Sequence, residues 1–477
     1  RTMSKSSKRP LRFLYDNSLF LIGGAIAALV WANIDSEGYR HFTEAEIIGA
    51  DPAPAWWSGT LESTELSSTL AHTRVSTEGN TLHVTVDNKP HYDLLSAKRA
   101  ELIAALVTKP PSDGTRIADI QFHKRHRLSL HFLVNDLLMA LFFAIAAKEV
   151  WEALLPGGAL SDPRKAATPL LATVGGMVGP AGLFLLGVSL FGPEDLSNGW
   201  AVPMATDIAF SYLVARFVFG ARHPAIPFLL LLAIADDAGG LLVLAIFFPQ
   251  DAVRPEWLLL TAGAVLLGFA MRRMKLKSFW WYLLGPGVIS WFSFFEAHLH
   301  PALGLVPIIP TMPHAHTDLG MFVRRELGRE DTLNAFEHWW KNPVELILGL
   351  FGLVNAGVVL SSVGNGTYLV LAGLAIGKPL GITLLAWLGA KLFKLQVPDG
   401  VDFRDVFIVG VIAGLGFTVA LFMSTAAFPA GKYPAELLDS VKMGALASFA
   451  IGPIAILIAK MMGVKRVADD PPSHGDT

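Results

Sequence analysis

The stretch "LLLLAIADDAGGLLVLAIFF", residues 229–248, places two adjacent carboxylates, Asp236 and Asp237, inside an otherwise apolar segment. An apolar segment of 18 or more residues is long enough to cross a membrane as a helix. A charged side chain at the centre of a bilayer costs about 2.5–3.5 kcal/mol on insertion scales. The stretch therefore predicts a membrane helix whose two acids have a function.

The composition of the whole chain is typical of a membrane protein. Of its 477 residues, 52% are hydrophobic and 16% are charged, and the mean hydropathy is +0.48. Soluble domains carry about 25% charged residues. The net charge of −2 gives no basis for nucleic-acid binding. The lack of cysteine excludes disulfides, thiolate metal sites and a cysteine nucleophile.

Hydropathy predicts an all-α polytopic membrane protein with about twelve helices. Their approximate ranges are 17–34, 128–155, 166–191, 199–218, 224–248, 256–271, 279–296, 299–311, 343–361, 366–391, 405–427 and 436–463. Prolines interrupt the seventh and eighth of these helices. The first range reaches membrane length, so we interpret it as a retained helix, although a cleaved signal peptide is the alternative.

Basic residues predict the orientation of these helices. Every second connection is rich in Lys and Arg, as in 272–277, and the short connections between them have at most one such residue, as in "GPEDLSNG". Because basic connections stay in the cytoplasm, residues 1–16 and 464–477 should both be cytoplasmic. The run "HKRHR" at 123–127 lies on the opposite side, which is tolerated because long translocated segments escape this rule.

Residues 39–127 form the one sizeable segment outside the predicted membrane domain of 128–463. "TLHVTVDN" at 81–88 alternates like a half-buried strand and ends in a turn. Residues 93–109 follow the pattern of an amphipathic helix that stops at Pro110 and Pro111. We predict a small extracytoplasmic α+β insert between the first and second membrane helices.

Five of the predicted helices carry ionisable groups near their centres. These groups are Asp136, Asp207, the pair Asp236 and Asp237, Glu296 and Lys378. Neighbours on a helix point about 100° apart, so the paired acids cannot face one partner equally. Lys378 is the one lysine that we predict deep within a helix, and it is the natural partner of one acid. The other acid would face a wet cavity.

Two buried neighbouring carboxylates repel each other, and burial disfavours their charged forms. At least one should therefore exchange protons near neutral pH, and the site can hold protons or a metal cation but hardly both. A buried salt bridge that only fixes helix packing is the structural alternative, and it would leave one acid unpaired.

Two predicted helices contain breaks near their middles. "AVPMATDIAF" at 201–210 places Pro203 and Thr206 before Asp207, and "GVIAGLGFTVALF" at 410–422 is rich in glycine. Broken helices at corresponding positions of two halves are typical of inverted-repeat transporters with a midplane binding site. Asp207 can compensate the positive half-helix N-termini, and Lys378 the negative C-termini. Close packing at the glycines and a helix cap at Asp207 are the alternatives.

Weaker signals occur at two places. "FFEAHLHPALG" at 294–304 contains Glu296, His298 and His300, which could respond to pH or could be surface and packing residues. Histidines at i and i+2 do not share a helical face, so no metal site is expected there. Lys148 and Glu149 could pair or snorkel, or could form the mouth of a cation funnel.

Taken in order along the chain, several motifs resemble those of the NhaA-type bacterial sodium/proton antiporters. They are "NDLLMALFF", "GWAVPMATDIAF", "LAIADDAGGLLVLAIFF", "NAGV" (355–358), "IGKPLGI" and "GVIAGLGFTVALF". The resemblance implies twelve helices in two inverted-topology repeats, about 166–248 and 366–463, with discontinuous crossing fourth and eleventh helices. It implies electrogenic exchange of Na⁺ or Li⁺ for protons, two per Na⁺, by a homodimer in the bacterial inner membrane that serves pH and sodium homeostasis. No cofactor and no enzymatic activity are implied.

The resemblance also implies roles for individual residues. Asp237 would be the main carrier of Na⁺, Li⁺ or H⁺, and Asp236 would pair with Lys378. Thr206 and Asp207 would stabilise the crossing and the cation route. Asp136 and Glu149 would be auxiliary acids.

Three features depart from the family's pattern. Trp151 and Glu152 stand where a basic pair is usual, and segment 39–127 is longer than the usual outer hairpin, which leaves the dimer contact open. Glu345 has no evident role.

Two other functions are alternatives to the exchange of a cation for protons. A Na⁺-coupled organic-solute symporter on a similar fold would favour Asn, Gln and Ser at the site over paired acids with a lysine. An intramembrane aspartyl protease would need two aspartates on facing helices. Adjacent aspartates on one helix argue against that enzyme.

Overall fold

The computed structural model describes most of the chain. The described ranges are 19–44, 55–64, 73–78, 81–86, 89–108, 119–124, 129–158, 163–314, 331–395, 400–429 and 432–464, with a few single residues between them. The predicted cytoplasmic segment 1–16 lies outside these ranges, as do most of 464–477 and residues 125–127 of the basic run. Two compact units make up the chain: Arg1–Arg40, Val134–Pro429 and Ala435–Thr477 form the large unit, and His41–Leu133 with Ala430–Pro434 forms the small unit.

The small unit is an α+β structure. Strands β1 (Thr73–Glu78), β2 (Thr81–Val86) and β3 (Asp119–Lys124) form a sheet in the order β1-β2-β3. The β1–β2 pair is antiparallel and the β2–β3 pair is parallel, with Leu82 opposite Ile120. Helices α4 (Ala55–Ser63), α5 (Lys89–Ala97) and α6 (Arg99–Thr108) supply the other elements. The strand predicted at 81–88 is confirmed as β2.

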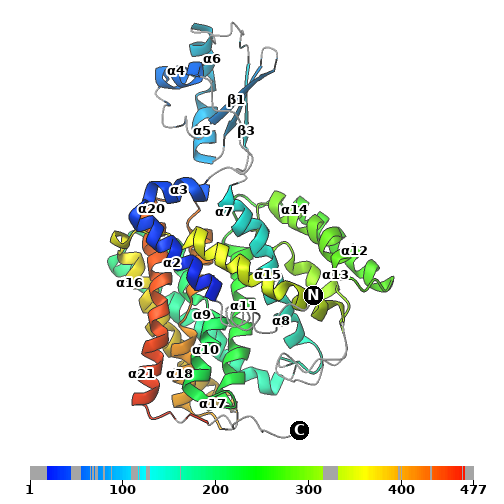
Figure 1. Cartoon of the computed structure of the whole chain (residues 1–477), viewed down its shortest axis with the longest axis vertical. Coiled ribbons are helices and arrows are strands. Elements are labelled where there is room, and N and C mark those ends of the chain that lie inside the picture. Colours follow the sequence, from blue (N-terminus) through cyan, green and yellow to red (C-terminus); the bar gives the residue numbers. More distant parts are fainter. Residues whose placement is uncertain are drawn as a thin grey trace, which may run out of the picture. The chain divides into compact units, whose positions relative to one another are not determined.

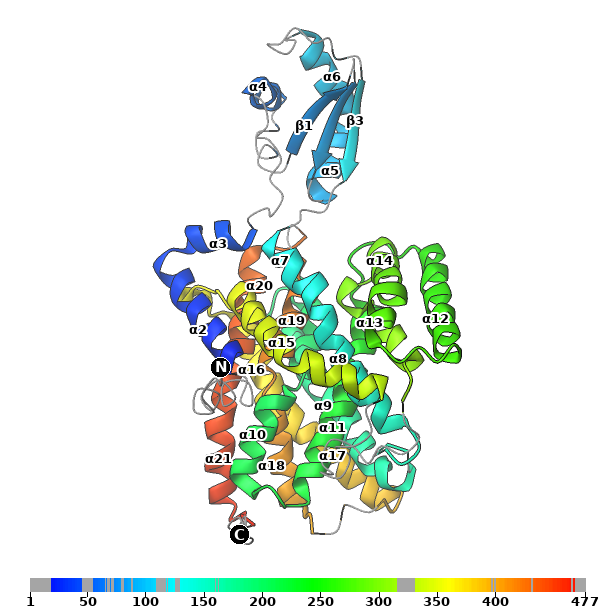
Figure 2. The same ribbon diagram turned by 45° about the vertical axis from the view of Figure 1, so that its right-hand side comes forward.

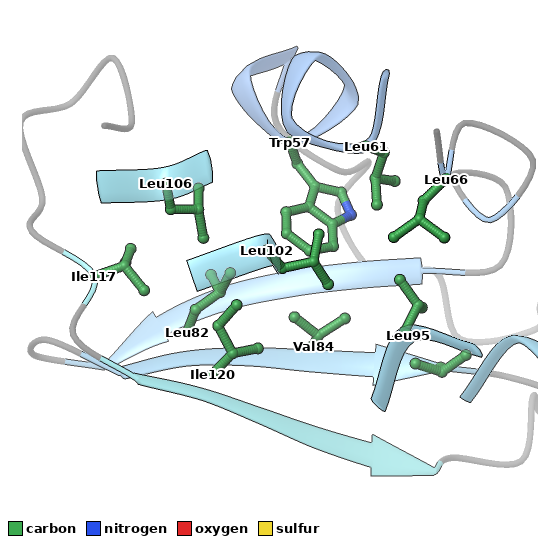
Figure 3. Close-up of a cluster of buried hydrophobic side chains, with 11 residues drawn as sticks. Trp57, Leu61, Leu66, Leu82, Val84, Leu95, Leu102, Leu106, Ile117 and Ile120 are labelled. Carbon is green, nitrogen blue, oxygen red and sulfur yellow. The ribbon is translucent and has the colours of Figure 1, made fainter. Parts of the chain in front are cut away.

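Alternation along β2 builds the core of the small unit. Leu82, Val84 and Val86 point to one face of the sheet and are fully buried. Trp57 from α4 and Leu102 from α6 pack onto this face, as Figure 3 shows. The Trp57 indole donates a hydrogen bond to the Thr73 hydroxyl at 3.0 Å, which satisfies its one polar atom.

The single helix predicted at 93–109 is wrong, because the chain breaks at Lys98 into α5 and α6. Leu95 on α5 and Leu102 and Leu106 on α6 all join the same core. The apolar pattern therefore continues across the break, and periodicity alone does not reveal the turn.

The other described elements of the chain are helices. In chain order its elements are α2 (Leu19–Ile34), α3 (Ser36–Glu44), α7 (Leu130–Phe132), η2 (Leu133–Leu138), α8 (Met139–Leu154), α9 (Pro163–Phe191), η3 (Glu194–Met204), α10 (Ile208–Phe219), α11 (Ala225–Phe247), η4 (Pro255–Trp257), α12 (Leu258–Arg273), α13 (Phe279–Tyr282), η5 (Leu283–Gly287), α14 (Val288–Glu296), η6 (Pro301–Leu303), η7 (Val306–Thr311), α15 (Thr332–Asn355), η8 (Leu360–Ser362), α16 (Asn365–Ala372), η9 (Gly373–Gly377), α17 (Lys378–Leu392), α18 (Phe403–Ala413), α19 (Phe417–Ala427), α20 (Ala435–Ala447), η10 (Ser448–Ala450) and α21 (Ile451–Met461). Of these, η2, η5 and η9 are π-helical turns, and the other η elements are 3₁₀ helices.

Several helices are long and apolar enough to cross a membrane. Within the described residues there are five: Leu130–Leu154, Ala166–Phe191, Ala225–Phe247, Asn365–Leu392 and Ala435–Met461. Two bent pairs raise this number to seven: η3 with α10, bent by 54°, and α18 with α19, bent by 53°. Both breaks lie where the sequence predicts them. The chain is therefore a multi-pass membrane protein, and the count of twelve spans stays a prediction.

Two of the predicted spans need correction. Residues 299–311 form two short 3₁₀ helices, η6 and η7, rather than an α-helix. Prolines within this segment lack the amide hydrogen that an α-helix needs. The span predicted at 343–361 is α15, which begins at Thr332 and ends at Asn355. Its early start is explained by Asp331, whose carboxylate accepts a hydrogen bond from the Asn334 amide at 2.7 Å as an N-cap.

The helices of the large unit pack as two groups. We call α9, η3, α10, α11 and α16–α21 the crossing group, and α2, α8 and α12–α15 the side group. Both views show α12, α13 and α14 together, away from α10 and α18 (Figures 1 and 2). The groups meet where α8 packs on α11 and where α15 packs on α19.

Glycines set the close packing of α9 on α17. A Cβ at Gly175 would lie 2.1 Å from the Gly381 carbonyl oxygen, and a Cβ at Gly381 would lie 2.1 Å from that of Gly175. Only a residue without a side chain fits either position.

Candidate functional site

The two broken helices meet at Asp207. Its backbone amide donates to the Leu415 carbonyl at 2.6 Å, which joins the two breaks directly. Its carboxylate accepts from the Phe210 amide at 3.3 Å and from the Thr418 amide at 3.2 Å, and also from the Thr418 hydroxyl. One buried carboxylate therefore caps the N-termini of both α10 and α19, where helix dipoles favour negative charge.

Lys378 lies at the opposite end of the break. Its side chain is fully buried, and its Nζ donates to the Met204 carbonyl, at the C-terminal end of η3. Lys378 follows directly on the π-helical turn η9, and such turns are frequent at functional sites. A Cβ at Gly373 in that turn would lie 2.6 Å from the Pro203 Cβ, so the turn packs tightly on the broken helix.

The two acids of α11 have different surroundings. The Asp236 carboxylate is buried and accepts from Lys378 Nζ at 2.8 Å and from the Thr206 hydroxyl at 2.6 Å. Asp237 is half-buried and forms no hydrogen bond or ion pair within the part of the chain that the structure describes. Adjacent side chains diverge by about 100° on a helix, so engaging one acid leaves the other free.

Asp237 lines a cavity between α8 and the crossing group. The lining is largely apolar and includes Phe143 from α8, Met177 from α9 and Met423 from α19. Asp236 also borders it. Water and counter-ions are scarce in such surroundings, so a carboxylate there favours a proton or a bound cation.

Asp136 lies in a second buried polar cluster. It sits in the π-helical turn η2, and its Oδ1 accepts from the Gln250 side-chain amide at 3.1 Å. The Nδ1 atom of His300 is 3.8 Å from the same oxygen, and the Trp291 indole donates to the Asp136 carbonyl at 2.9 Å. Asp136 therefore joins segments that are far apart in the sequence.

Three residues of the 294–304 motif lie in different surroundings: Glu296, His298 and His300. His300 is buried and faces Asp136, whereas His298 Nδ1 lies 2.9 Å from the Ala252 carbonyl. Glu296 is half-buried at the C-terminus of α14. The response of these residues to pH stays a prediction.

Lys148 and Glu149 on α8 also differ from each other. Lys148 is buried and pairs with Glu152 at 2.6 Å and with Glu337 of α15 at 2.5 Å. Glu149 is close enough to Asp237 for their charges to interact. Lys148 therefore forms ion pairs, which is one of the two predicted possibilities. The other possibility, a cation funnel that includes Glu149, stays a prediction.

Sequence reasoning missed two residues. Lys442 on α20 is 8% exposed and was not singled out. Asp439, one turn before Lys442, interacts with it electrostatically, and this i,i+3 spacing was the available signal. Gln250 was also missed. Its signal is a polar residue just after the apolar run of α11.

Two interrupted helices that meet at a buried carboxylate, beside an acid pair and a buried ammonium, are typical of secondary transporters. A family model for "Na+/H+ antiporter 1" matches residues 114–459. The chain belongs to this Na⁺/H⁺ antiporter family.

Similar proteins agree with this assignment. The Na⁺/H⁺ antiporter NhaA of Jannaschia sp. (strain CCS1) is 46% identical over 483 residues, which cover 96% of this chain and 99% of the relative. The NhaA of Geobacter metallireducens is 46% identical and covers 96% of this chain and 100% of the relative. That of Geotalea uraniireducens is 48% identical over 341 residues, 71% of this chain and 87% of the relative.

Proposed function

We propose that the chain is a Na⁺/H⁺ antiporter, also able to carry Li⁺, whose ions bind at Asp237 and Asp236. One observation carries the proposal: Lys378 engages Asp236, whereas Asp237 lines the cavity without a partner among the described residues. The names of the relatives support exchange over symport with an organic solute.

Exchange follows from competition for one carboxylate. In apolar surroundings a bare carboxylate is costly, so Asp237 is neutralised by a proton or by Na⁺. It cannot hold both, because each neutralises the same charge. Alternating access then converts this competition into transport: Na⁺ binds on one side and releases a proton, and a proton from the other side releases Na⁺.

Asp236, Lys378 and Thr206 form the second part of the proposed site. An arriving Na⁺ can take an Asp236 oxygen that otherwise accepts from Lys378 and Thr206. The site then has Asp237 and the Lys378–Asp236 pair as two places for protons. This supports the stoichiometry of two protons per Na⁺ that the family resemblance implies. Such exchange is electrogenic, and the membrane potential contributes about 2.3 kcal/mol per charge per 100 mV.

The remaining residues would support the route. Asp207 would hold the two broken helices at their crossing, because it caps both. Glu149 would attract cations toward Asp237, and Asp136 would act as an auxiliary buried acid. Glu345 has no proposed role.

We also propose a topology and a cellular location. Twelve segments would cross the bacterial inner membrane in two inverted repeats, about 166–248 and 366–463, with both termini in the cytoplasm. The small unit would then be extracytoplasmic. The protein would work as a homodimer in the lipid bilayer, without a cofactor, in pH and sodium homeostasis.

Reconstituted protein tests the function directly. Proteoliposomes carry an imposed proton gradient that is followed with a pH-sensitive dye, and Na⁺ or Li⁺ is then added. The wild type should collapse the gradient, and Asp237→Asn should not. Asp195→Asn is the matched control, because Asp195 is an exposed aspartate on η3. An unchanged response of Asp237→Asn would remove Asp237 from the mechanism.

A further inference from the structure

Helices α8 and α11 run antiparallel beside the cavity, which residues of η3, α9 and α19 also line. Ala146 of α8 and Gly240 of α11 line it, as do Phe143 and Val243. Beyond one end, Glu149 lies near Asp237. From Asp237 and Glu149 toward the opposite end of the cavity, the residue numbers rise along α11 and fall along α8.

The same order leads to a hydrogen bond beyond the opposite end of the cavity. The Gln250 side chain donates to Asp136 Oδ1 at 3.1 Å, just past the last turn of α11. Asp136 lies seven residues before Phe143, about two helical turns away. The bond thus joins the two helices six residues beyond the last lining residue of each, Leu244 on α11 and Phe142 on α8.

Both partners of this bond are held in place. The Gln250 amide donates to the His298 carbonyl at 2.9 Å, and the Arg254 amide donates to the Ala297 carbonyl at 3.1 Å, so the loop after α11 is tied to the turn after α14. On the other side, the Trp291 indole donates to the Asp136 carbonyl at 2.9 Å.

Asn135, the neighbour of Asp136, is fixed as well. It exchanges two amide hydrogen bonds with Asn355, at 3.0 and 2.7 Å. A side-chain hydrogen bond between two such anchored segments sets the distance between them.

The two partners belong to different helix groups. Gln250 continues α11 of the crossing group, which carries Asp236 and Asp237, whereas Asp136 belongs to the helix of α8 in the side group. The hydrogen bond therefore links the two groups on this side of the cavity. If the two groups separate here, this bond and the backbone bonds from the same loop to the turn after α14 must break or lengthen.

We propose that Gln250 is a positioning residue for ion exchange, whose hydrogen bond to Asp136 closes the Gln250 end of the cavity. The identity of the ion rests on the function proposed above, but the closure does not. A hydrogen bond to a carboxylate is among the stronger ones in a protein, and in surroundings of low dielectric it favours the closed form. Its loss should shift the equilibrium toward the open form by about tenfold.

The absence of cysteine from the chain allows a direct test. Val243 lines the cavity one turn before the end of α11, and Val243→Cys places one thiol there. The labelling rate of purified protein by a charged methanethiosulfonate reports access from water. Gln250→Ala should raise this rate about tenfold, and Gln250→Leu, which keeps the bulk, should do the same if the alanine variant folds poorly.

Exchange of the two side chains distinguishes loss of this hydrogen bond from a general loosening of the helix packing. In the double variant Gln250→Glu with Asp136→Asn, the asparagine donates to the glutamate, and the slow rate should return. Thr261→Val is the matched control: it removes the 2.7 Å hydroxyl contact between Thr261 and Ser293, a side-chain bond between α12 and α14. It should leave the rate unchanged.

Wild-type labelling in both Gln250 variants, or an equal rise in Thr261→Val, would overturn the proposal. Labelling needs neither Na⁺ nor a proton gradient, so failure of the antiport assay and failure of this closure are separate results.

Discussion

Lys378 Nζ lies 2.8 Å from Asp236 Oδ2, whereas Asp237, the next residue, lines the cavity. Helical geometry turns these neighbours in different directions, so one lysine can serve only one of them. The pair is therefore divided into an acid with a fixed partner and an acid that needs a mobile one. Exchange of Na⁺ for protons is the function that such a division supports best.

Removal of the Lys378 ammonium should destabilise the protein strongly. Lys378→Ala leaves the buried Asp236 without its cation, which costs about 3–5 kcal/mol when one partner of a buried pair is lost. The double variant Asp236→Asn with Lys378→Ala removes both charges of this ion pair and should lose less stability. Thermal unfolding of purified protein in detergent measures both. Lys460→Ala, at an exposed lysine of α21, should melt like the wild type. A wild-type Tm for Lys378→Ala would contradict the prediction.

The Thr206 hydroxyl should matter for ion affinity. It donates to Asp236 at 2.6 Å, and Thr206→Val removes this bond while keeping the shape of the side chain. The lost hydrogen bond to a charged group corresponds to about 1.5–3 kcal/mol. We expect the half-saturating Na⁺ concentration in the proteoliposome assay to change at least severalfold. Thr206→Ser keeps the hydroxyl and should stay near the wild type. Equal effects of Val and Ser would contradict the prediction, because the serine variant keeps the hydroxyl.

Two glycines of α9 should respond differently to the same substitution. Gly175→Ala would place a Cβ 2.1 Å from the Gly381 carbonyl oxygen, so α9 and α17 would have to move apart. Gly182→Ala meets no atom within 4 Å. We expect a clear fall in Tm for Gly175→Ala and a small or positive change for Gly182→Ala, since alanine favours the helix. Similar Tm values for the two variants would argue against the close crossing of α9 and α17.

The small unit should depend on its own core. Leu102 on α6 is fully buried, whereas Leu94 on α5 is 41% exposed. Leu102→Ala should destabilise this unit by about 2–5 kcal/mol because it creates a cavity. Limited proteolysis of the full chain should therefore cut residues 41–133 faster in Leu102→Ala, and Leu94→Ala should be cut at the wild-type rate. Equal rates in the two leucine variants would refute the assigned core.

Sequence patterns located the parts of the fold that depend on backbone chemistry. Pro203 and the glycines at 410–416 mark the two breaks, because proline lacks a donor and glycine tolerates irregular backbone. Asp236, Asp237 and Lys378 were recognisable because a charge in an apolar helix is too costly to be incidental.

Other features depend on tertiary contacts that periodicity does not encode. Gln250 lies 114 positions from Asp136, and Glu337 lies 189 positions from Lys148. The π-helical turns before Lys378 and at Asp136 have no distinct hydrophobic pattern. The N-terminal turns of α15 are polar enough to resemble a loop, although Asp331 caps them as a helix.

Proton release on Na⁺ binding tests the central claim most directly. Purified protein in weakly buffered detergent solution is titrated with Na⁺ at a series of pH values, and a dye follows the protons set free. Binding should release protons over a limited pH range, and Asp237→Asn should release fewer or none. If the wild type binds Na⁺ at every pH without releasing a proton, the ions do not compete for one carboxylate, and the proposed exchange at Asp237 is contradicted.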